Sequence, residues 1–399
     1  MPGRRRLPLT ARWTAAIGAA IVIVAVAVIV TAAIAGRGPS CGSAVWGQLQ
    51  GDPAHDGQGQ GTAGTLSVRW TRQGKASGGA VLVGDELLVG QQGGVADLST
   101  SNGVERWHWS TADQKGGNVG SPALNGCSVA VVESRPDQTA QGVHAVLHVV
   151  STSTHQLVGK GLDIPSVSAG GVLSNGSRFE IVGGRVESGT VKWGLYTVNA
   201  DSAVASSLAA LAAFTPGPPA AEGETSYVAG WDNSAQAIAS SGRQLWRTAT
   251  TALPLTTPVV TAGKVLVGTI GGVDAFDAGT GKVLWTEPVT SGVVTAPLPA
   301  GGLVYAVDRA YHKLHILDMG SGRDLAQVQL GTTLSPPVLV GTRVITVDEQ
   351  GDMLALDARS GRLLQKLTLK SGVRSPLVVG GGSLYAIGND GRVTAVSLG

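Results

Sequence analysis

Four stretches in the C-terminal half of the chain repeat one pattern, a strand, a glycine-containing turn and a second strand. The four stretches are residues 271–285, 313–326, 351–365 and the shorter 391–399. A proline precedes each stretch, and the gaps of 39, 39 and 40 residues separate Pro258, Pro297, Pro336 and Pro376. Toward the N-terminus, gaps of 39, 54, 43 and 42 residues lead to Pro219, Pro165, Pro122 and a proline-less equivalent near Ala80. The chain therefore contains eight consecutive units.

Each unit consists of short runs that alternate between hydrophobic and polar residues, as in residues 81–90 and 264–272. A period near 40 residues with such runs is typical of a four-stranded propeller blade and not of a helical repeat. We therefore predict an all-β, eight-bladed β-propeller of four-stranded antiparallel sheets, with seven blades as the alternative. The composition agrees, because 59 Gly and 14% charged residues argue against a coiled coil, while 43% hydrophobic residues argue against disorder. Residues 203–213 are compatible with a short helix or a strand.

The residues that recur in the turn of each unit have a physical explanation. Asp277, Asp318 and Asp357 each end a strand, where the side chain can accept hydrogen bonds from backbone amides of the turn. A glycine four residues later can adopt the positive φ that a tight return needs. The proline markers suit the first residue of an inner strand, where a missing N–H costs no ladder bond. The glycine excess is thus a turn requirement, and the chain contains neither a dinucleotide-binding glycine motif nor a GxxxxGK[ST] motif.

The last unit stops at Gly399 after its third strand and lacks a fourth. Residues 68–74, which precede the first unit, resemble the fourth-strand segments of other units. We therefore expect the strand around Trp70 to complete the C-terminal blade and close the ring, which pairs two edges that would otherwise be exposed. The tryptophans of these segments are then residues that pack between blades: Trp70, Trp107, Trp246 and Trp285.

The N-terminal region carries a separate signal. Residues 1–40 hold five Arg and no acidic residue, which leaves 24 basic and 27 acidic residues, net −3, for the remainder. Residues 15–35 are uncharged over 21 positions, and a helix of that length spans about 31 Å at about 1.5 Å per residue, close to a hydrocarbon core of about 30 Å. Four Arg before this run and Arg37 after it predict a cytoplasmic N-terminus. A net negative remainder argues against a nucleic-acid partner.

We therefore divide the chain into a cytoplasmic basic tail (1–14), a transmembrane helix (15–35) in the lipid bilayer, an extracytoplasmic stalk and pre-propeller segment (36–65) and the propeller (66–399). Two alternatives export the same domain. A signal peptide could be cleaved after Ala35, although its apolar run is longer than the usual ~7–15 residues. Cys41 could be acylated in a lipoprotein, although Gly38 stands where an aliphatic residue is usual.

The two cysteines, Cys41 and Cys127, agree with export, because an isolated pair in an oxidising compartment favours a disulfide. Such a bond would close a loop of roughly 86 residues and contribute roughly 4–5 kcal/mol in the chain-entropy model. It would fasten the segment after the membrane to the folded body. The alternative is two separate thiols.

The repeat Asp-Ala-x-Thr-Gly-Lys-x-Leu-Trp at 277–285 resembles the repeat of pyrroloquinoline-quinone (PQQ)-type β-propellers. Residues 46–57, from Trp46 through GDPAHDG, resemble the segment common just upstream of these propellers. The resemblance covers residues 46–399. It implies the fold, but the family includes both quinone-dependent dehydrogenases and non-enzymatic propellers, such as the lipoprotein of the outer-membrane barrel-assembly machinery.

The chemistry of the quinone dehydrogenases is missing from the sequence. They resemble each other in an adjacent-cysteine disulfide, a Ca²⁺ site and an Asp base, whereas this chain has no adjacent cysteines and places its acids at blade turns around the ring, where they cannot converge on one calcium ion. No constellation supplies a base within reach of a substrate. We therefore expect no catalytic, cofactor-binding or metal-binding residues, no PQQ and no calcium. The pairs His144/His148 and His312/His315 are expected to lie at the surface.

The chain is thus expected to act as a membrane-anchored, extracytoplasmic interaction or scaffold module that binds an envelope protein. The alternative is a propeller that binds or senses a small molecule or saccharide, and a PQQ-dependent dehydrogenase ranks third. A channel plugged by side chains favours the first function, and a pocket of several hundred Å³ with converging polar groups favours the second. Tyr and Arg commonly anchor interfaces, and our candidate contact residues lie in loops between strands: Arg309, Tyr311, Lys313 and Arg374.

Overall fold

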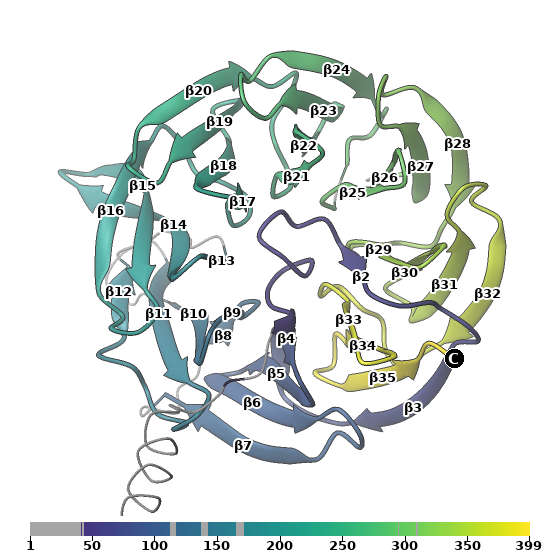
Figure 1. Cartoon of the computed structure of the whole chain (residues 1–399), viewed down its shortest axis with the longest axis horizontal. Helices are drawn as coiled ribbons and strands as arrows, with labels where there is room; N and C mark the ends of the chain where they lie inside the picture. The colour runs from purple at the N-terminus through teal and green to yellow at the C-terminus, as the bar shows by residue number, and fades with distance from the viewer. Residues whose placement is uncertain are drawn as a thin grey trace, which may run out of the picture. The chain divides into compact units, whose positions relative to one another are not determined.

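The computed structural model describes residues 41, 44–111, 117–136, 143–164, 171–293, 295–308 and 310–399. The basic tail predicted for residues 1–14 and the transmembrane helix predicted for 15–35 lie outside these residues. Within them, no helix has the length and hydropathy needed to cross a bilayer. The regular elements of the described part are strands, and Figure 1 shows them arranged as a ring of radial sheets.

Eight sheets of four or five strands form the ring in the described residues, and the strands within each blade pair antiparallel, which confirms the eight-bladed prediction. Blade 1 contains β4 (Ala76–Val83), β5 (Glu86–Gln91), β6 (Gly94–Ser99) and β7 (Glu105–Ser110). Blade 2 contains β8 (Asn118–Val119), β9 (Ala123–Asn125), β10 (Ser128–Pro136), β11 (Val143–Ser151) and β12 (Leu162–Ile164). Blade 3 contains β13 (Val172–Asn175), β14 (Arg178–Glu187), β15 (Thr190–Asn199) and β16 (Ala205–Leu211).

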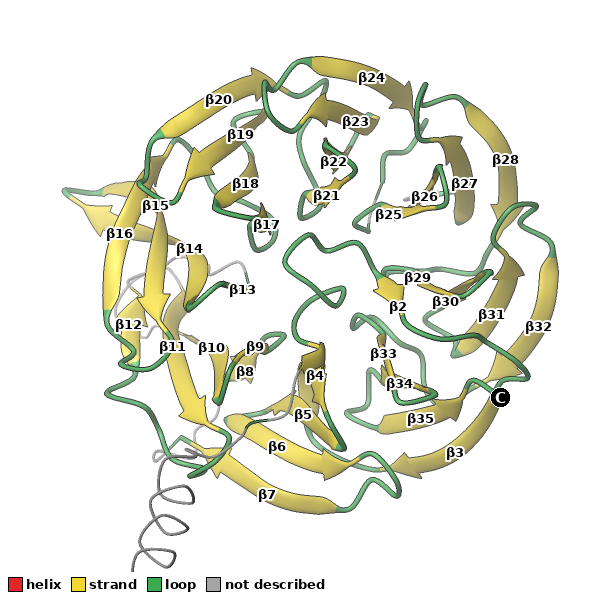
Figure 2. Cartoon of the chain, viewed as in Figure 1, coloured by secondary structure: helices red, strands yellow, loops and turns green. Residues whose placement is uncertain are grey.

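In the next three blades the four strands follow one another in chain order from the centre of the ring to its rim (Figure 2). Blade 4 contains β17 (Ala220–Glu222), β18 (Thr225–Gly230), β19 (Ser234–Ala239) and β20 (Gln244–Ala249). Blade 5 contains β21 (Val259–Thr261), β22 (Lys264–Thr269), β23 (Gly272–Asp277) and β24 (Val283–Pro288). Blade 6 contains β25 (Leu298–Ala300), β26 (Leu303–Val307), β27 (Lys313–Asp318) and β28 (Asp324–Gln329).

The last two blades complete the ring. Blade 7 contains β29 (Val338–Val340), β30 (Arg343–Val347), β31 (Asp352–Asp357) and β32 (Leu363–Thr368). Blade 8 contains β33 (Val378–Gly380), β34 (Ser383–Ile387), β35 (Val393–Ser397) and, as its outermost strand, β3 (Ser67–Arg72). β3 pairs antiparallel with β35, from Ser67 opposite Ser397 to Arg72 opposite Val393. Closure of the ring by the strand around Trp70 is therefore confirmed.

The core lies in layers between neighbouring blades. One cluster joins Val259, Leu266 and Trp285 of blade 5 to Val304 and Leu317 of blade 6. The second and third strands of a blade are buried along most of their length, whereas the fourth alternates between partly buried and exposed positions. This difference arises because inner strands are covered on both faces by neighbouring blades, as buried sheets generally are.

The predicted contacts of the tryptophans between blades are present. Trp70, Trp246 and Trp285 each donate their indole N–H to a carbonyl in the turn between the third and fourth strands of the next blade, at 2.8–3.0 Å. Trp107 instead stacks on the His155 ring at 4.4 Å, with 16° between the planes. All four therefore pack against the following blade.

Residues 44–59, which we call the central segment, lie across the centre of the ring in Figure 1. β1 (Ala44–Trp46) pairs antiparallel with β4, and β2 (Gln58–Gly59) pairs parallel with β29. Between them, backbone carbonyls of the segment accept hydrogen bonds from N–H groups of inner strands in blades 2, 4, 5 and 7 at 2.7–3.0 Å: Leu124, Ala221, Val260 and Leu339. The segment is thus tied to inner strands around the ring.

Candidate interaction face

The ring has two ends that carry different loops. Strand direction alternates within an antiparallel blade, so the connection between the second and third strands and the connection to the next blade lie at the same end. We call this end the loop face. The candidate loops 308–312, between β26 and β27, and 369–377, between β32 and β33, both belong to it. Arg309 itself lies outside the described residues.

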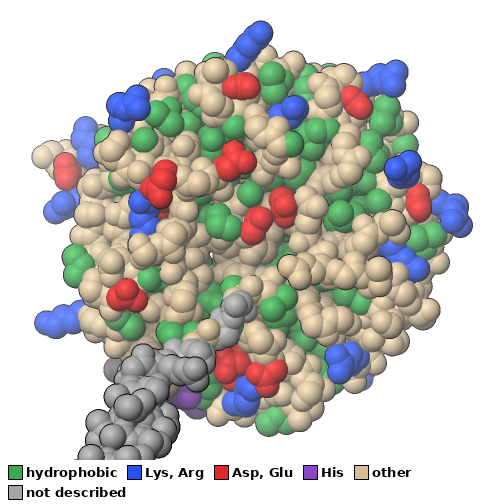
Figure 3. All heavy atoms as spheres, in the orientation of Figure 1, with side chains coloured by type: hydrophobic (Ala, Val, Ile, Leu, Met, Phe, Trp, Pro, Cys, Tyr) green, Lys and Arg blue, Asp and Glu red, His purple; other side chains and the backbone are tan. Residues whose placement is uncertain are grey.

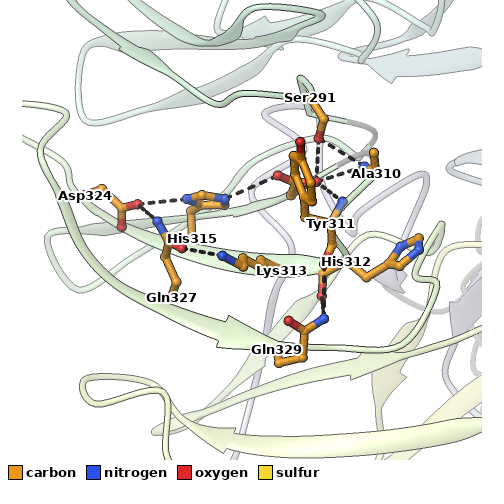
Figure 4. Close-up of polar contacts among 10 residues, drawn as sticks. Ser291, Ala310, Tyr311, His312, Lys313, His315, Asp324, Gln327 and Gln329 are labelled. Carbon is orange, nitrogen blue, oxygen red and sulfur yellow. Dashed lines mark hydrogen bonds and ion pairs between the residues drawn. The ribbon is translucent and has the colours of Figure 1, made fainter.

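Tyr311 is held at the tip of its loop by Asp308. One carboxylate oxygen of Asp308 accepts hydrogen bonds from the backbone N–H of Ala310 at 2.8 Å and of Tyr311 at 2.6 Å, and from the Ser291 hydroxyl at 2.5 Å (Figure 4). Burial opposes ionisation of Asp308, but these hydrogen bonds outweigh it and lower the pKa of its carboxyl. The Tyr311 side chain remains 56% exposed and is therefore presented to solvent by a fixed turn.

The expectation that the histidine pairs lie at the surface is wrong for His315 and His148. His315 is buried, with Nδ1 2.8 Å from an Asp324 oxygen (Figure 4) and Nε2 3.7 Å from an Asp308 oxygen. His148 is buried with Nε2 3.0 Å from Glu133. Both side chains lie on blade strands whose inner positions are covered by a neighbouring blade, so they serve as buried polar partners.

The structure does not bring the candidate residues into one cluster. Lys313 begins β27 and donates from Nζ to the Gln327 side-chain oxygen in β28 at 3.0 Å (Figure 4). Arg374 belongs to the connection into blade 8, and its Nε donates to the Glu349 carboxylate. The blade 6 residues and Arg374 are thus separate contributions to the same face.

Two exposed apolar residues that we did not single out from the sequence share the position of Tyr311. Trp231 follows β18 in blade 4 and is 50% exposed, and Ile270 follows β22 in blade 5 and is 43% exposed. Together with Tyr311 in blade 6, they occupy the second-to-third-strand loops of three consecutive blades. We call these three side chains the apolar loop patch. The signal in the sequence was a large apolar residue inside a turn, visible once the repeats are aligned at this loop.

Phe214 connects the patch to the centre of the ring. The Trp231 backbone N–H donates to the Phe214 carbonyl at 2.8 Å, and their rings meet edge to face at 4.8 Å between centroids. Trp193 also contacts Phe214, with 5.3 Å between the ring centroids. Phe214 also lines the cavity described next, so it links Trp231 to that cavity.

A cavity of about 340 Å³ lies at the loop-face end of the ring's centre. Its walls come from the connections that precede the inner strands of blades 2 to 7, including Phe214, Pro216 and Leu334, and the central segment contributes Leu49 and Gln50. No charged residue is among the described residues that line it. We call it the central cavity; its volume lies within the range of roughly 300–1,000 Å³ usual for ligand sites.

On the face seen in Figure 3, acidic side chains lie near the centre of the ring and most Lys and Arg lie along the rim.

Ionisable groups of the central segment have displaced pKa values. Burial, together with the nearby charge of Asp52, raises the pKa of Asp56 to about 6. Burial lowers the pKa of His55 to about 4, so this side chain is neutral at pH 7. Its Nδ1 lies 3.3 Å from the Thr257 hydroxyl of blade 5.

The repeated turn acids accept hydrogen bonds from residues of their own turns, as the sequence predicts. One carboxylate oxygen of Asp277 accepts from the hydroxyl of Thr280 at 2.7 Å and from its backbone N–H at 2.8 Å, and Asp318 and Asp357 make equivalent bonds. The hydroxyl bond and then the amide bond lower the pKa of each carboxyl. Among the described residues, no group of three His, Cys, Asp or Glu residues is placed to hold a metal ion.

The two cysteines are not free, and both Cys41 and Cys127 are disulfide-bonded.

Fold, closure and turn chemistry together define a PQQ-repeat β-propeller. The family model described as outer membrane protein assembly factor BamB matches residues 178–275, 232–315 and 310–398, which is more than half of the chain. The protein belongs to this family.

One curated relative, the outer membrane protein assembly factor BamB of Burkholderia pseudomallei (strain K96243), is 30% identical over 166 residues. That match covers 36% of this chain and 44% of the relative, so it spans less than half of the relative's length.

Solved structures share the fold at lower identity. BamB from Moraxella catarrhalis superposes with a TM-score of 0.62 at 15% identity, covering 84% of this chain and 100% of the other. A quinohemoprotein alcohol dehydrogenase from Pseudomonas putida HK5 gives 0.65 at 12% identity, covering 89% and 80%. A europium-containing methanol dehydrogenase gives 0.63 at 10%, covering 88% and 89%. At these identities the likeness concerns the fold alone.

Proposed function

We propose that this protein is a membrane-anchored, extracytoplasmic interaction module that binds a protein partner of the cell envelope through its loop face. The observation that carries the proposal is the apolar loop patch of Trp231, Ile270 and Tyr311. Large apolar side chains exposed on consecutive loops are typical of protein-binding surfaces, and Trp and Tyr are enriched among the residues that dominate binding energy. A rigid ring also allows its loops to vary without disturbing the core.

The proposal is tested by recovering partners from cells. The full-length protein is purified in detergent with its partners, which are quantified by mass spectrometry. A Trp231→Ser/Tyr311→Ser variant should lose at least about tenfold of a partner that the wild type enriches, since hot-spot truncations commonly cost about 2 kcal/mol or more. The control is Leu363→Ser, which removes a side chain that is 51% exposed on the outer strand β32. Equal recovery by both variants would contradict the proposal.

The anchoring is a separate part of the proposal and rests on the uncharged run at residues 15–35. The protein should resist extraction from membranes by alkaline carbonate, and external protease should degrade the propeller in spheroplasts. A mature N-terminus that begins just after Ala35 would show that the run is a cleaved signal peptide. Acylated Cys41 at the mature N-terminus would support the lipoprotein alternative.

We also propose that the protein is not an enzyme and takes neither PQQ nor calcium. The support is that the recurrent acids Asp277, Asp318 and Asp357 already accept hydrogen bonds from their own turns. Calcium-dependent reduction of a dye by the protein with added PQQ and an alcohol or a sugar would overturn this part.

A further inference from the structure

The outermost strand of each blade ends its sheet at the rim of the ring. In the described residues these strands are β3, β7, β12, β16, β20, β24, β28 and β32 (Figure 1). All of them except β16 carry at least one charged residue, as shown by Arg69, Glu105, Asp163, Arg247, Glu287, Asp324 and Lys366. Charged side chains on an edge strand oppose its pairing with another strand.

β16 lacks this protection. Its sequence is Ala-Ser-Ser-Leu-Ala-Ala-Leu, and no charged residue occurs between Asp201 and Glu222. It lies in the segment that the sequence left open between helix and strand, and in the described sheet it pairs with β15 alone. Ser206, Ser207 and Ala210 of this strand are exposed. Because small, uncharged side chains allow close approach of another strand, β16 is the unprotected edge of the described ring.

The two ends of β16 carry opposite charges. Asp201 lies in the turn that leads into β16, and Lys192 lies on β15 just beyond the other end of β16. Both residues are exposed and form no ion pair among the described residues, whereas Arg185 and Glu187 of the same hairpin pair with each other at 3.7 Å. In an antiparallel pair, the start of one strand lies beside the end of the other. A second copy would therefore bring its Asp201 to the end where Lys192 lies, and this contact would form twice.

We propose that β16 pairs antiparallel with β16 of a second copy of this chain, so that the two blade 3 sheets become continuous across a two-fold axis. Identical patches then face each other, as in most homodimers. The second copy presents the same uncharged strand, so no like charges meet along β16. This contact lies on the rim and leaves the apolar loop patch free, so it goes beyond the proposed function and is independent of it.

The test is a disulfide crosslink in the full-length protein, in cells that produce it. Ser207 lies next to the midpoint of β16, so a two-fold pair brings the two Ser207 residues close together. After oxidation with copper phenanthroline, Ser207→Cys should give a dimer on a non-reducing gel. The control is Thr286→Cys, which changes a hydroxyl residue exposed on the outer strand β24. The dimer yield of Ser207→Cys should be at least about fivefold higher, because a disulfide requires Cα atoms within about 7 Å of each other.

An exchange of charges tests the antiparallel direction. In the Ser207→Cys protein, Lys192→Asp alone and Asp201→Lys alone should each lower the dimer yield at least about threefold, because each sets like charges against each other. The double variant Lys192→Asp/Asp201→Lys should restore the yield, since the contact forms again with its signs exchanged. A role of either residue within one copy would not produce this rescue.

Equal dimer yields from Ser207→Cys and Thr286→Cys, or a yield that none of the charge changes affects, overturn the proposed pairing. A crosslink from Ser207→Cys to a different protein in place of a second copy would overturn it in favour of a strand from that protein. None of these results affects the proposed function, which stands or falls on partner recovery by the Trp231→Ser/Tyr311→Ser variant.

Discussion

Replacing Gly281 by Ala tests whether the tryptophan contacts between blades require the glycine of the repeated turn. Gly281 has a φ of +71°, and a Cβ built there would lie 2.5 Å from the Trp246 ring of the preceding blade. The Trp246 indole is 8% exposed and donates its N–H to the Ala278 carbonyl at 2.8 Å. The added methyl therefore meets both an unfavourable backbone and a fixed ring.

The expected loss follows from these two effects. A non-glycine residue in the left-handed region costs about 1–2 kcal/mol. A Cβ at 2.5 Å forces the indole away, and loss of its hydrogen bond and contacts adds about 1–2 kcal/mol. We expect Gly281→Ala to reduce the free energy of unfolding by about 3 kcal/mol.

Gly279→Ala is the matched control in the same turn. Gly279 does not have a positive φ, and a Cβ there would meet only the Asp277 carboxylate, at 3.6 Å. Its unfolding free energy should stay within about 0.5 kcal/mol of the wild type, as for most surface changes. Urea unfolding followed by tryptophan fluorescence and circular dichroism measures both variants. If Gly281→Ala is as stable as Gly279→Ala, packing of the ring against this turn does not demand glycine.

Three further predictions concern Asp56 in the central segment, the two cysteines, and Trp70 in the strand that closes the ring. Asp56→Asn should stabilise the protein more at pH 7.5 than at pH 4.5. The folded pKa of Asp56 is about 6 against 3.8, so the folded state binds more protons between these two values, and wild-type stability falls as the pH rises through that window. The gain, about 1 kcal/mol because the carboxyl is partly exposed, is measured by urea unfolding at both pH values, and an equal effect at both would contradict the assignment. Maleimide should label neither Cys41 nor Cys127 in denatured, unreduced protein, and should label both after reduction. Labelling of both before reduction would show that these cysteines do not form a disulfide. Trp70→Ala should cost about 2 kcal/mol, less than the about 3–5 kcal/mol of a fully buried aromatic because Trp70 is only partly buried, and a thermal scan showing no loss would refute its part in closure.

The blade repeat was readable from the sequence because its determinants are local. The Asp-to-hydroxyl turn and the glycine four residues later act within five positions, and the structure places them as the spacing predicts. The role of the central segment was not readable. Its carbonyls bind N–H groups of inner strands up to 282 positions away, from Gly57 to Leu339, and backbone hydrogen bonds of this kind leave no pattern in side chains.

The candidate site was only partly predictable, for a related reason. Tyr311 was found because it lies in an obvious loop, but Trp231 was passed over because the other tryptophans of the repeat lie on outer strands. His315 lies on the third strand of blade 6, which is buried along most of its length because the neighbouring blade covers it, and the sequence of that strand does not show this cover.

Blade 2 provides a natural counterpart to Gly281→Ala. Its turn carries His155 where the other tryptophan-facing turns carry glycine, with a φ of +59° and the same backbone bond, from the His155 N–H to the Ser151 carbonyl at 2.9 Å. Here the facing Trp107 stacks flat on the imidazole, and its buried indole N–H has no partner among the described residues. A Cβ at this position is therefore compatible with the ring only where the tryptophan gives up its bond to the turn and gains a stacking surface in exchange. Alanine supplies no such surface, which is why the loss expected at Gly281 includes both the backbone cost and the indole hydrogen bond.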